Sequence, residues 1–216
     1  MLHVCDAFED DAERCLEAVT DAHRRLTNAR LTGVVEIIPA FTTVGVFVDP
    51  ANTEALEVKI AATLNGRPPS NRGKLAKPRR IEVPVCYDEE FAVDLHDVAE
   101  HSGLQLAEVI TLHAAARYRV RCVGFTPGFP YLSGLPAELA TGRRASPRKA
   151  VAAGSVAIGG RQTGIYPQQS PGGWNIIGRT PLRLFDPEQA SPSLFKIGDG
   201  VRFRAITRAE FDQLSG

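Results

Sequence analysis

The sequence at residues 147–187 reads PRKAVAAGSVAIGGRQTGIYPQQSPGGWNIIGRTPLRLFDP, and it decides the fold of the second half of the chain. Short apolar runs alternate there with glycine and proline, and the stretch contains the only tryptophan, Trp174. Short strands at close spacing with such punctuation are typical of a closed β-barrel. We expect strands at 118–125, 155–158, 163–166, 174–178, 182–185 and 201–206.

Positive charge is concentrated in the same part of the chain. Residues 121–185 carry eight Lys or Arg and one acid, Glu138, although the whole chain balances 25 Lys and Arg against 25 Asp and Glu. Clustered charge of one sign attracts an oppositely charged partner. The stretch therefore predicts an anionic ligand or an acidic partner surface. The alternative is that these arginines solvate strand edges.

Length and composition place the chain among globular proteins. Its 216 residues allow one large or two small domains with a sizeable core. No apolar run approaches the ~18 residues that cross a membrane, and the acidic N-terminal sequence is unlike a secretory signal. We expect a cytoplasmic protein with no membrane partner.

The four cysteines, Cys5, Cys15, Cys86 and Cys122, are far apart in the sequence. They form no CxxC pair and have no histidine at ligand spacing, so they predict no metal site. We expect reduced, mostly buried thiols, as in cytoplasmic proteins.

The first part of the chain predicts a small α+β domain at residues 1–78. Its expected elements are a helix at 10–26, strands at 34–38 and 44–48, a helix at 53–65, and residues 2–5 as a further strand. Residues 66–80, GRPPSNRGKLAKPRR, lack periodicity and are rich in Pro, Gly and basic residues. They predict a linker, with the second domain at 79–216.

The second domain begins with an expected strand at 81–86 and a helical pair at 94–101 and 105–115, and it ends with a short helix at 209–214. The pair resembles a DNA-binding helix-turn-helix, but residues 94–116 contain four acids and no Lys or Arg. A recognition helix needs cations that neutralise phosphates. The pair is therefore interpreted as packing, with no nucleic-acid partner. His113 lies near its apolar stripe and is read as a structural histidine, with a catalytic base as the alternative.

Motifs for nucleophilic or phosphate chemistry are incomplete. Residues 154–161, GSVAIGGR, have the glycine content of a phosphate loop but lack the Gly-Lys-Ser/Thr and the following helix. No GxSxG motif or nucleophile–base pair is present, so no catalytic residue is assigned. Gly172 and Gly173 could direct backbone N–H groups at an anion, although paired glycines usually make a turn.

A second unusual stretch, GFTPGFPYL at residues 124–132, combines prolines with three aromatic residues. A stiff aromatic loop suits a pocket wall or an interface, and the alternative is a plug over the barrel mouth. The residues expected to form this wall or interface are Phe125, Pro127, Gly128, Phe129, Pro130 and Tyr131.

Three segments together resemble the B subunit of bacterial 5-oxoprolinase. They are GFTPGFPYLSGLP, SPRKAVAAGSVAIGGRQTGIYPQQSPGGWNIIGRTPLRLFDP and IEVPVCYDEEFAVDL, and the resemblance covers residues 30–206. The same family is described as allophanate hydrolase subunit 1 and includes a histidine-kinase inhibitor of sporulation. The resemblance implies an α+β fold, with a small N-terminal α/β domain followed by a cyclophilin-like β-barrel domain.

The resemblance also implies a function shared with other chains. The B subunit would open 5-oxoproline to glutamate together with the A and C subunits of the enzyme, the latter a related barrel protein. The co-substrate would be ATP, with or without Mg²⁺, and the isolated chain would be inactive. Kinase inhibition and allophanate hydrolysis are the alternative functions. A barrel that handles a carboxylate and phosphates fits the local positive charge, and arginine suits both anions. The expected substrate- or nucleotide-binding residues are Arg161, Gln162, Thr163, Tyr166, Gly172, Gly173, Trp174 and Arg179.

Two features depart from the family pattern. Family members usually begin with a Gly-Asp-containing strand, whereas this chain begins MLHVCDAFED. We therefore expect a degenerate first strand or a misassigned start. Gln168 and Gln169 stand where the family often has a charged pair, so no charge role is expected there.

Overall fold

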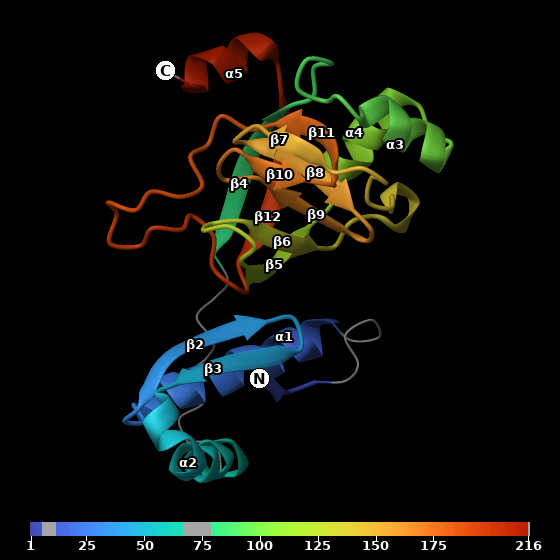
Figure 1. Cartoon of the computed structure of the whole chain (residues 1–216). Helices are drawn as coiled ribbons and strands as arrows, with labels where there is room; N and C mark the ends of the chain where they lie inside the picture. The colour runs from blue at the N-terminus through green and yellow to red at the C-terminus, as the bar shows by residue number, and fades with distance from the viewer. Residues whose placement is uncertain (6–11, 67–78, 216) are drawn as a thin grey trace. The chain divides into compact units, whose positions relative to one another are not determined.

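The protein is described here by a computed structural model that covers residues 1–5, 12–66 and 79–215 (Figure 1). The chain forms two compact units, Met1–Pro78 and Arg79–Gly216. Most of the expected linker, residues 67–78, and the start of the expected first helix lie outside the described residues. Within the described part of the chain, no helix has the length and apolar character needed to cross a membrane.

The N-terminal unit is a three-stranded antiparallel sheet packed against a helix. The sheet order is β1-β3-β2, and helix α1 contacts β2 and β3 while α2 contacts α1. One apolar stripe of α1 is buried because its residues recur at helical spacing. The elements are β1 (Leu2–His3), α1 (Ala12–Ala29), β2 (Val34–Ala40), β3 (Thr43–Val48), η1 (Pro50–Asn52) and α2 (Thr53–Asn65).

The expectation of four reduced cysteines is wrong for one pair. Cys5 and Cys15 form a disulfide, with Cα atoms 5.4 Å apart. Strand β1 is paired with β3 and α1 packs on the same sheet, so the fold brings together two residues that sequence spacing did not associate. Cys86 and Cys122 are free and buried, as expected.

The second unit is built on a closed barrel, which confirms the expected α+β fold. Its strand order is β11-β4-β12-β5-β6-β9-β8. Strands β4 and β12 pair in parallel, and the other neighbours are antiparallel. The strands are β4 (Arg80–Cys86), β5 (Tyr118–Val123), β6 (Pro130–Ser133), β8 (Ser155–Gly159), β9 (Gln162–Ile165), β11 (Asn175–Arg179) and β12 (Gly200–Ile206).

Two further strands, β7 (Arg148–Val151) and β10 (Ser170–Gly172), pair with each other outside the barrel order. They were not predicted, nor was β6, because each is short and contains or adjoins proline or glycine. The expected strand at 182–185 is wrong. That segment forms only one isolated bridge, between Phe185 and Ser193, and it lies between Pro181 and Pro187, which cannot donate ladder hydrogen bonds.

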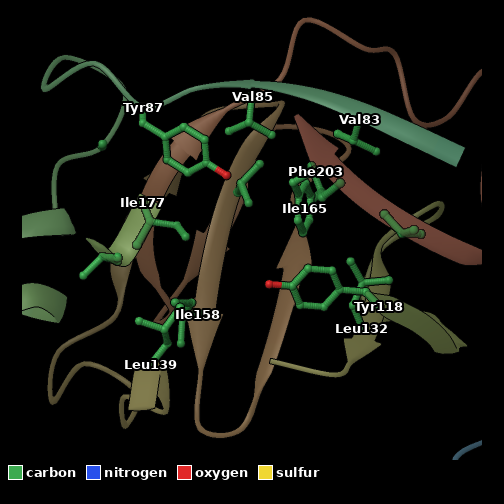
Figure 2. Packing of buried hydrophobic residues seen from close by; sticks show 14 of the residues in the cluster. Val83, Val85, Tyr87, Tyr118, Leu132, Leu139, Ile158, Ile165, Ile177 and Phe203 are labelled. Atoms are coloured by element: carbon green, nitrogen blue, oxygen red, sulfur yellow. The ribbon is translucent and has the colours of Figure 1, made fainter. Parts of the chain in front are cut away.

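The barrel interior is filled with apolar and aromatic side chains (Figure 2). Helices α3 (Leu95–Ser102) and α4 (Leu106–Ala115) contact β11 and β12 respectively, and α5 (Arg208–Ser215) contacts β4. The α3–α4 pair buries Leu95, Val98 and Val109 in the same core, so its interpretation as a packing element is confirmed. The remaining short helix is η2 (Ala137–Leu139).

Candidate functional site

The second unit has a hollow of about 300 Å³ where aromatic and arginine side chains meet. We call it the aromatic pocket. Its walls come from the 125–131 segment, from the loop before β7, from the end of β9 and from β10 with the residues after it. The lining residues are Phe125, Phe129, Tyr131, Arg143, Arg144, Pro147, Tyr166, Pro171, Gly172, Gly173 and Trp174.

Phe129 is the centre of the aromatic wall. Its ring meets four others edge to face, at centroid distances of 4.8 Å to Tyr131, 5.2 Å to Tyr166 and 5.6 Å to both Phe125 and Trp174. Such pairs are worth ~0.5–1.5 kcal/mol each beyond the area that they bury. Phe129 and Trp174 are only 2% and 5% exposed, so the wall is held by the core.

Three glycines allow the aromatic rings to lie close against the strands. A Cβ at Gly159 would lie 2.4 Å from the Trp174 ring, one at Gly164 would lie 2.8 Å from Phe129, and one at Gly172 would lie 2.3 Å from the Tyr166 hydroxyl. All three distances are below 3.0 Å, a separation from other heavy atoms that a Cβ essentially never shows. Glycine is therefore needed at these three positions because the rings of Trp174, Phe129 and Tyr166 occupy the space of a side chain.

Phe125 stands at the rim of the pocket. Its side chain is 61% exposed, and its φ of 71° is in the left-handed region that non-glycine residues seldom adopt. The turn is closed on both sides, because Gly124 N–H donates to Phe129 O and Phe129 N–H donates to Thr126 O, each at 3.0 Å. An exposed aromatic residue in a strained conformation is typical of functional surfaces.

The backbone is held by a hydrogen bond on each side of Arg143. The carbonyl of Gly142 accepts a hydrogen bond from Asn175 Nδ2 at 2.8 Å, and the N–H of Arg144 donates to Gly173 O at 2.7 Å. The Arg143 side chain is exposed, and within residues 12–66 and 79–215 it has no ion pair. The guanidinium of Arg143 is therefore an available cation carried by a backbone that is held in place.

Arg144 is already paired. Its guanidinium binds the buried carboxylate of Asp94 at 2.6 Å and lies 3.5 Å from Asp97. Arg148 binds Asp94 as well, at 2.7 Å. Two of the basic residues counted in the sequence are thus neutralised inside the unit, and the positive charge of the pocket is smaller than the count implied.

The two pocket tyrosines remain neutral hydrogen-bond donors. Burial raises the pKa of Tyr131 and of Tyr166, and the nearby positive charge of Arg143 opposes this shift at both. Arg143 and both phenol groups line the same pocket. The pocket combines flat apolar walls, two hydroxyl donors and one available cation, which together can bind an anion attached to an apolar ring.

The structure brings together many of the predicted site residues. Tyr166, Gly172, Gly173 and Trp174 line the aromatic pocket, as do Phe125, Phe129 and Tyr131. Arg143 and Arg144 were missed as individual site residues. The only sequence signal for them was the local excess of basic residues.

Four predicted ligand residues do not line this pocket. Arg161 is exposed in the turn between β8 and β9, where Gln162 pairs with Gly159. Thr163 is fully buried and donates to Ala157 O at 2.9 Å. Arg179 donates to Ala153 O at 2.9 Å and lies over the Phe91 ring, 5.5 Å from its centroid.

Three residues of the predicted aromatic loop also lie outside the lining. Gly128, with φ of 86°, packs against Phe185, and a Cβ there would lie 2.8 Å from Phe185 Cβ. Pro130 is buried at the start of β6, and Pro127 is exposed. The loop is therefore partly pocket wall and partly barrel strand.

His113 is a structural histidine, as interpreted from the sequence. It is 0% exposed, its Nδ1 lies 2.8 Å from Tyr87 Oη, and its Nε2 lies 3.2 Å from Thr163 Oγ1. Thr163 gives its own proton to Ala157 O, so its oxygen accepts from Nε2–H and Nδ1 accepts from the tyrosine. Burial lowers the pKa of His113 to about 3. With both nitrogens occupied, it is not an available base.

A second hollow, of about 330 Å³, lies beside α1 and β2 in the N-terminal unit. Its lining includes His23, whose pKa is lowered mainly by burial. No set of aromatic walls converges on it, so it is the weaker candidate. In the described part of the chain, no group of three or more His, Cys, Asp or Glu residues could hold a metal ion.

Residues 3–195 match the family described as carboxyltransferase domain, subdomain C and D. The chain belongs to this family. It is 40% identical over 188 residues to the 5-oxoprolinase B subunit of Bacillus subtilis. The alignment covers 83% of this chain and 78% of that protein. It is 44% identical over 173 residues to the 5-oxoprolinase B subunit of Escherichia coli O157:H7, covering 80% of this chain and 78% of that protein. The resemblance seen in the sequence is confirmed, and the chain is a homologue of the 5-oxoprolinase B subunit.

Solved structures share the fold. The protein TTHA0988 superposes with a TM-score of 0.78 and 34% identity over 95% of this chain, which spans 39% of TTHA0988. PH0987 of Pyrococcus horikoshii superposes with a TM-score of 0.61 and 38% identity. The alignment covers 94% of this chain and 93% of the PH0987 chain. The K. lactis urea amidolyase, at 20% identity and a TM-score of 0.75, shows a likeness of fold alone.

Proposed function

We propose that this chain is the B component of an ATP-dependent 5-oxoprolinase that opens 5-oxo-L-proline to L-glutamate. The observation that carries the proposal is the similarity to curated 5-oxoprolinase B subunits at 40% and 44% identity over most of the chain. The partners are the A and C subunits of the enzyme, and ATP is the co-substrate, with or without Mg²⁺. The complex acts in the cytoplasm.

The geometry of the second unit supports a role that depends on partners. His113 is buried with both nitrogens engaged, and the two free cysteines are buried with raised pKa values. These are the groups most often used as bases and nucleophiles, and none is available at the aromatic pocket. We therefore assign binding and positioning to this chain, and the chemical step to groups that another protein of the complex supplies.

The proposed ligand-contacting part of this chain is the aromatic pocket. Of the residues expected to bind substrate or nucleotide, Tyr166, Gly172, Gly173 and Trp174 have the support of a shared cavity. Arg161, Gln162 and Arg179 lack that support. They remain proposals for contacts with a partner protein or with a ligand bound outside the pocket.

The test is reconstitution with one component left out at a time. The purified A, B and C subunits are mixed with ATP and 5-oxo-L-proline, and glutamate and ADP are measured. We expect turnover with all three subunits and none with this chain alone. Turnover that persists without this chain, or glutamate formed by this chain alone, would contradict the proposal.

A further inference from the structure

We propose that the aromatic pocket binds a small ring compound through one carboxylate, with Arg143 as the anchoring residue. The pocket itself is argued from its own geometry. Only the identification of the ligand as 5-oxo-L-proline rests on the proposed function. Arg143 was not among the residues that sequence analysis selected. Within the part of the chain that the structure describes it has no ion pair, in contrast to Arg144, the other arginine of the pocket lining.

The first step of the argument is charge. Arg143 and Arg144 both line the pocket, but Arg144 is bound to Asp94 at 2.6 Å and lies 3.5 Å from Asp97. Among the residues that the structure describes, this leaves Arg143 as the one lining cation without an ion pair. A single available guanidinium matches a monoanion. A triphosphate carries several charges, which proteins usually meet with several cations, Mg²⁺ or a helix N-terminus.

The second step is geometry. Arginine presents a planar fork that binds a carboxylate through two parallel hydrogen bonds. The backbone at Arg143 is held by the Asn175–Gly142 and Arg144–Gly173 hydrogen bonds, at 2.8 and 2.7 Å. Little backbone ordering is therefore left to occur when a ligand binds, which favours affinity.

The third step is the set of hydrogen-bond donors around Arg143. Tyr131 and Tyr166 line the same hollow as Arg143, so their hydroxyl groups and the guanidinium border one space. A phenol is protonated at neutral pH, and burial raises the pKa of both tyrosines further. They can donate to a second polar group of the ligand, such as a ring carbonyl, while the guanidinium binds the carboxylate.

The fourth step is size and shape. The hollow measures about 300 Å³, at the lower end of the range for ligand pockets. The rings of Trp174, Phe129 and Tyr166 lie against Gly159, Gly164 and Gly172, where no side chain could be added without displacing them. A five- or six-membered ring with one carboxylate suits this space and these apolar walls.

The experiment uses the emission of Trp174, the only tryptophan of the chain and part of the pocket lining. The full chain, alone and in the reconstituted complex, is titrated with 5-oxo-L-proline, with cyclopentanecarboxylate, with 2-pyrrolidinone and with ATP. Trp174→Phe removes this signal and identifies any response from partner tryptophans. We expect saturable responses to the two carboxylates, and at least about tenfold weaker binding of 2-pyrrolidinone, which lacks the carboxylate.

Arg143→Gln is the decisive variant, and Arg183→Gln is its control. Arg183 is 70% exposed, is absent from the pocket lining and pairs with Asp186. We expect Arg143→Gln to weaken carboxylate binding about tenfold or more with an unchanged melting temperature, and Arg183→Gln to leave binding unchanged. Equal effects of the two variants, a Trp174-dependent response to ATP stronger than that to the carboxylates, or no saturable response in either preparation would overturn the proposal.

The proposed function and the pocket assignment can be contradicted independently of each other. If the complex opens 5-oxo-L-proline and Arg143→Gln leaves its KM unchanged, the pocket assignment is wrong and the function stands. If no combination of subunits gives turnover while cyclopentanecarboxylate binds in an Arg143-dependent way, the pocket assignment stands and the function is wrong.

Discussion

The guanidinium of Arg148 binds the carboxylate of Asp94 through both terminal nitrogens, at 2.7 and 2.8 Å. Asp94 is 1% exposed and also accepts from the backbone N–H of Ile176 at 2.7 Å and from Arg144 at 2.6 Å. It occupies the N-cap position of α3, yet its side chain makes no capping bond. One buried carboxylate therefore joins the start of α3 to β7, β11 and the loop that carries Arg143.

We expect Asp94→Asn to lower the free energy of unfolding by about 3 kcal/mol, because it leaves two arginines without their buried counter-charge. The matched control is Asp97→Asn. Asp97 is 65% exposed and lies 3.5 Å from Arg144, so its loss should cost less than about 1 kcal/mol. Urea unfolding followed by Trp174 emission measures both. Similar losses for the two variants would mean that the Asp94 network contributes little to stability.

A second prediction concerns the packing of Trp174. In Gly159→Ala the new Cβ would lie 2.4 Å from the indole, so the ring must move. We expect a loss of about 1–3 kcal/mol in the free energy of unfolding and a shift in Trp174 emission. Gly142→Ala is the control, since a Cβ there meets nothing within 4 Å. An unchanged emission spectrum in Gly159→Ala would show that the wall adapts without displacing the ring.

Phe125 and Phe129 are expected to separate binding from stability. Phe129→Ala removes the buried centre of the aromatic wall and should cost about 3–5 kcal/mol. Phe125 is 61% exposed with φ of 71°, so Phe125→Gly removes little buried area and relieves backbone strain of about 1 kcal/mol or more. We expect its melting temperature to be unchanged or raised, and its binding of ligand or partner proteins to be weakened. Full binding by Phe125→Gly would leave this exposed ring without a functional role.

His113 gives stability a specific dependence on pH. Its pKa is about 3 in the folded chain and near 6.5 in an unfolded one. Between these values the unfolded state binds the extra proton, so the free energy of unfolding falls as pH falls through this window. The slope from this residue is at most about 1.4 kcal/mol per pH unit.

The measurement is the unfolding free energy of wild type and His113→Gln at pH 7 and pH 5. We expect His113→Gln to be less stable at pH 7, because it loses the bonds to Tyr87 and Thr163, and to lose less further stability at pH 5. His101→Gln, at an exposed position, controls for the loss of one histidine. An equal fall between the two pH values in wild type and His113→Gln would contradict a buried neutral imidazole.

Local sequence was sufficient for the elements whose pattern is repeated over many residues. Helical spacing of apolar residues located α1, α2, α3 and α4, because burial of one helix face imposes a period that can be read directly. Short apolar runs bounded by turn residues located β4, β8, β9 and β12. The charge of residues 94–116 favoured a packing role for the α3–α4 pair, and the burial of Leu95, Val98 and Val109 in the core agrees with it. The family resemblance also followed from sequence alone.

Only the tertiary structure decided which groups meet. Three relationships join residues from different segments of the chain: the Cys5–Cys15 disulfide, the pairing of Asp94 with Arg144 and Arg148, and the shared pocket lining of Arg143, Tyr131 and Tyr166. A count of basic residues records their charge, but not which carboxylate lies within ion-pair distance of each. Which carboxylate meets which arginine depends on strand order and register. These set the distances between segments, and the sequence of one segment does not show which other segment will lie beside it.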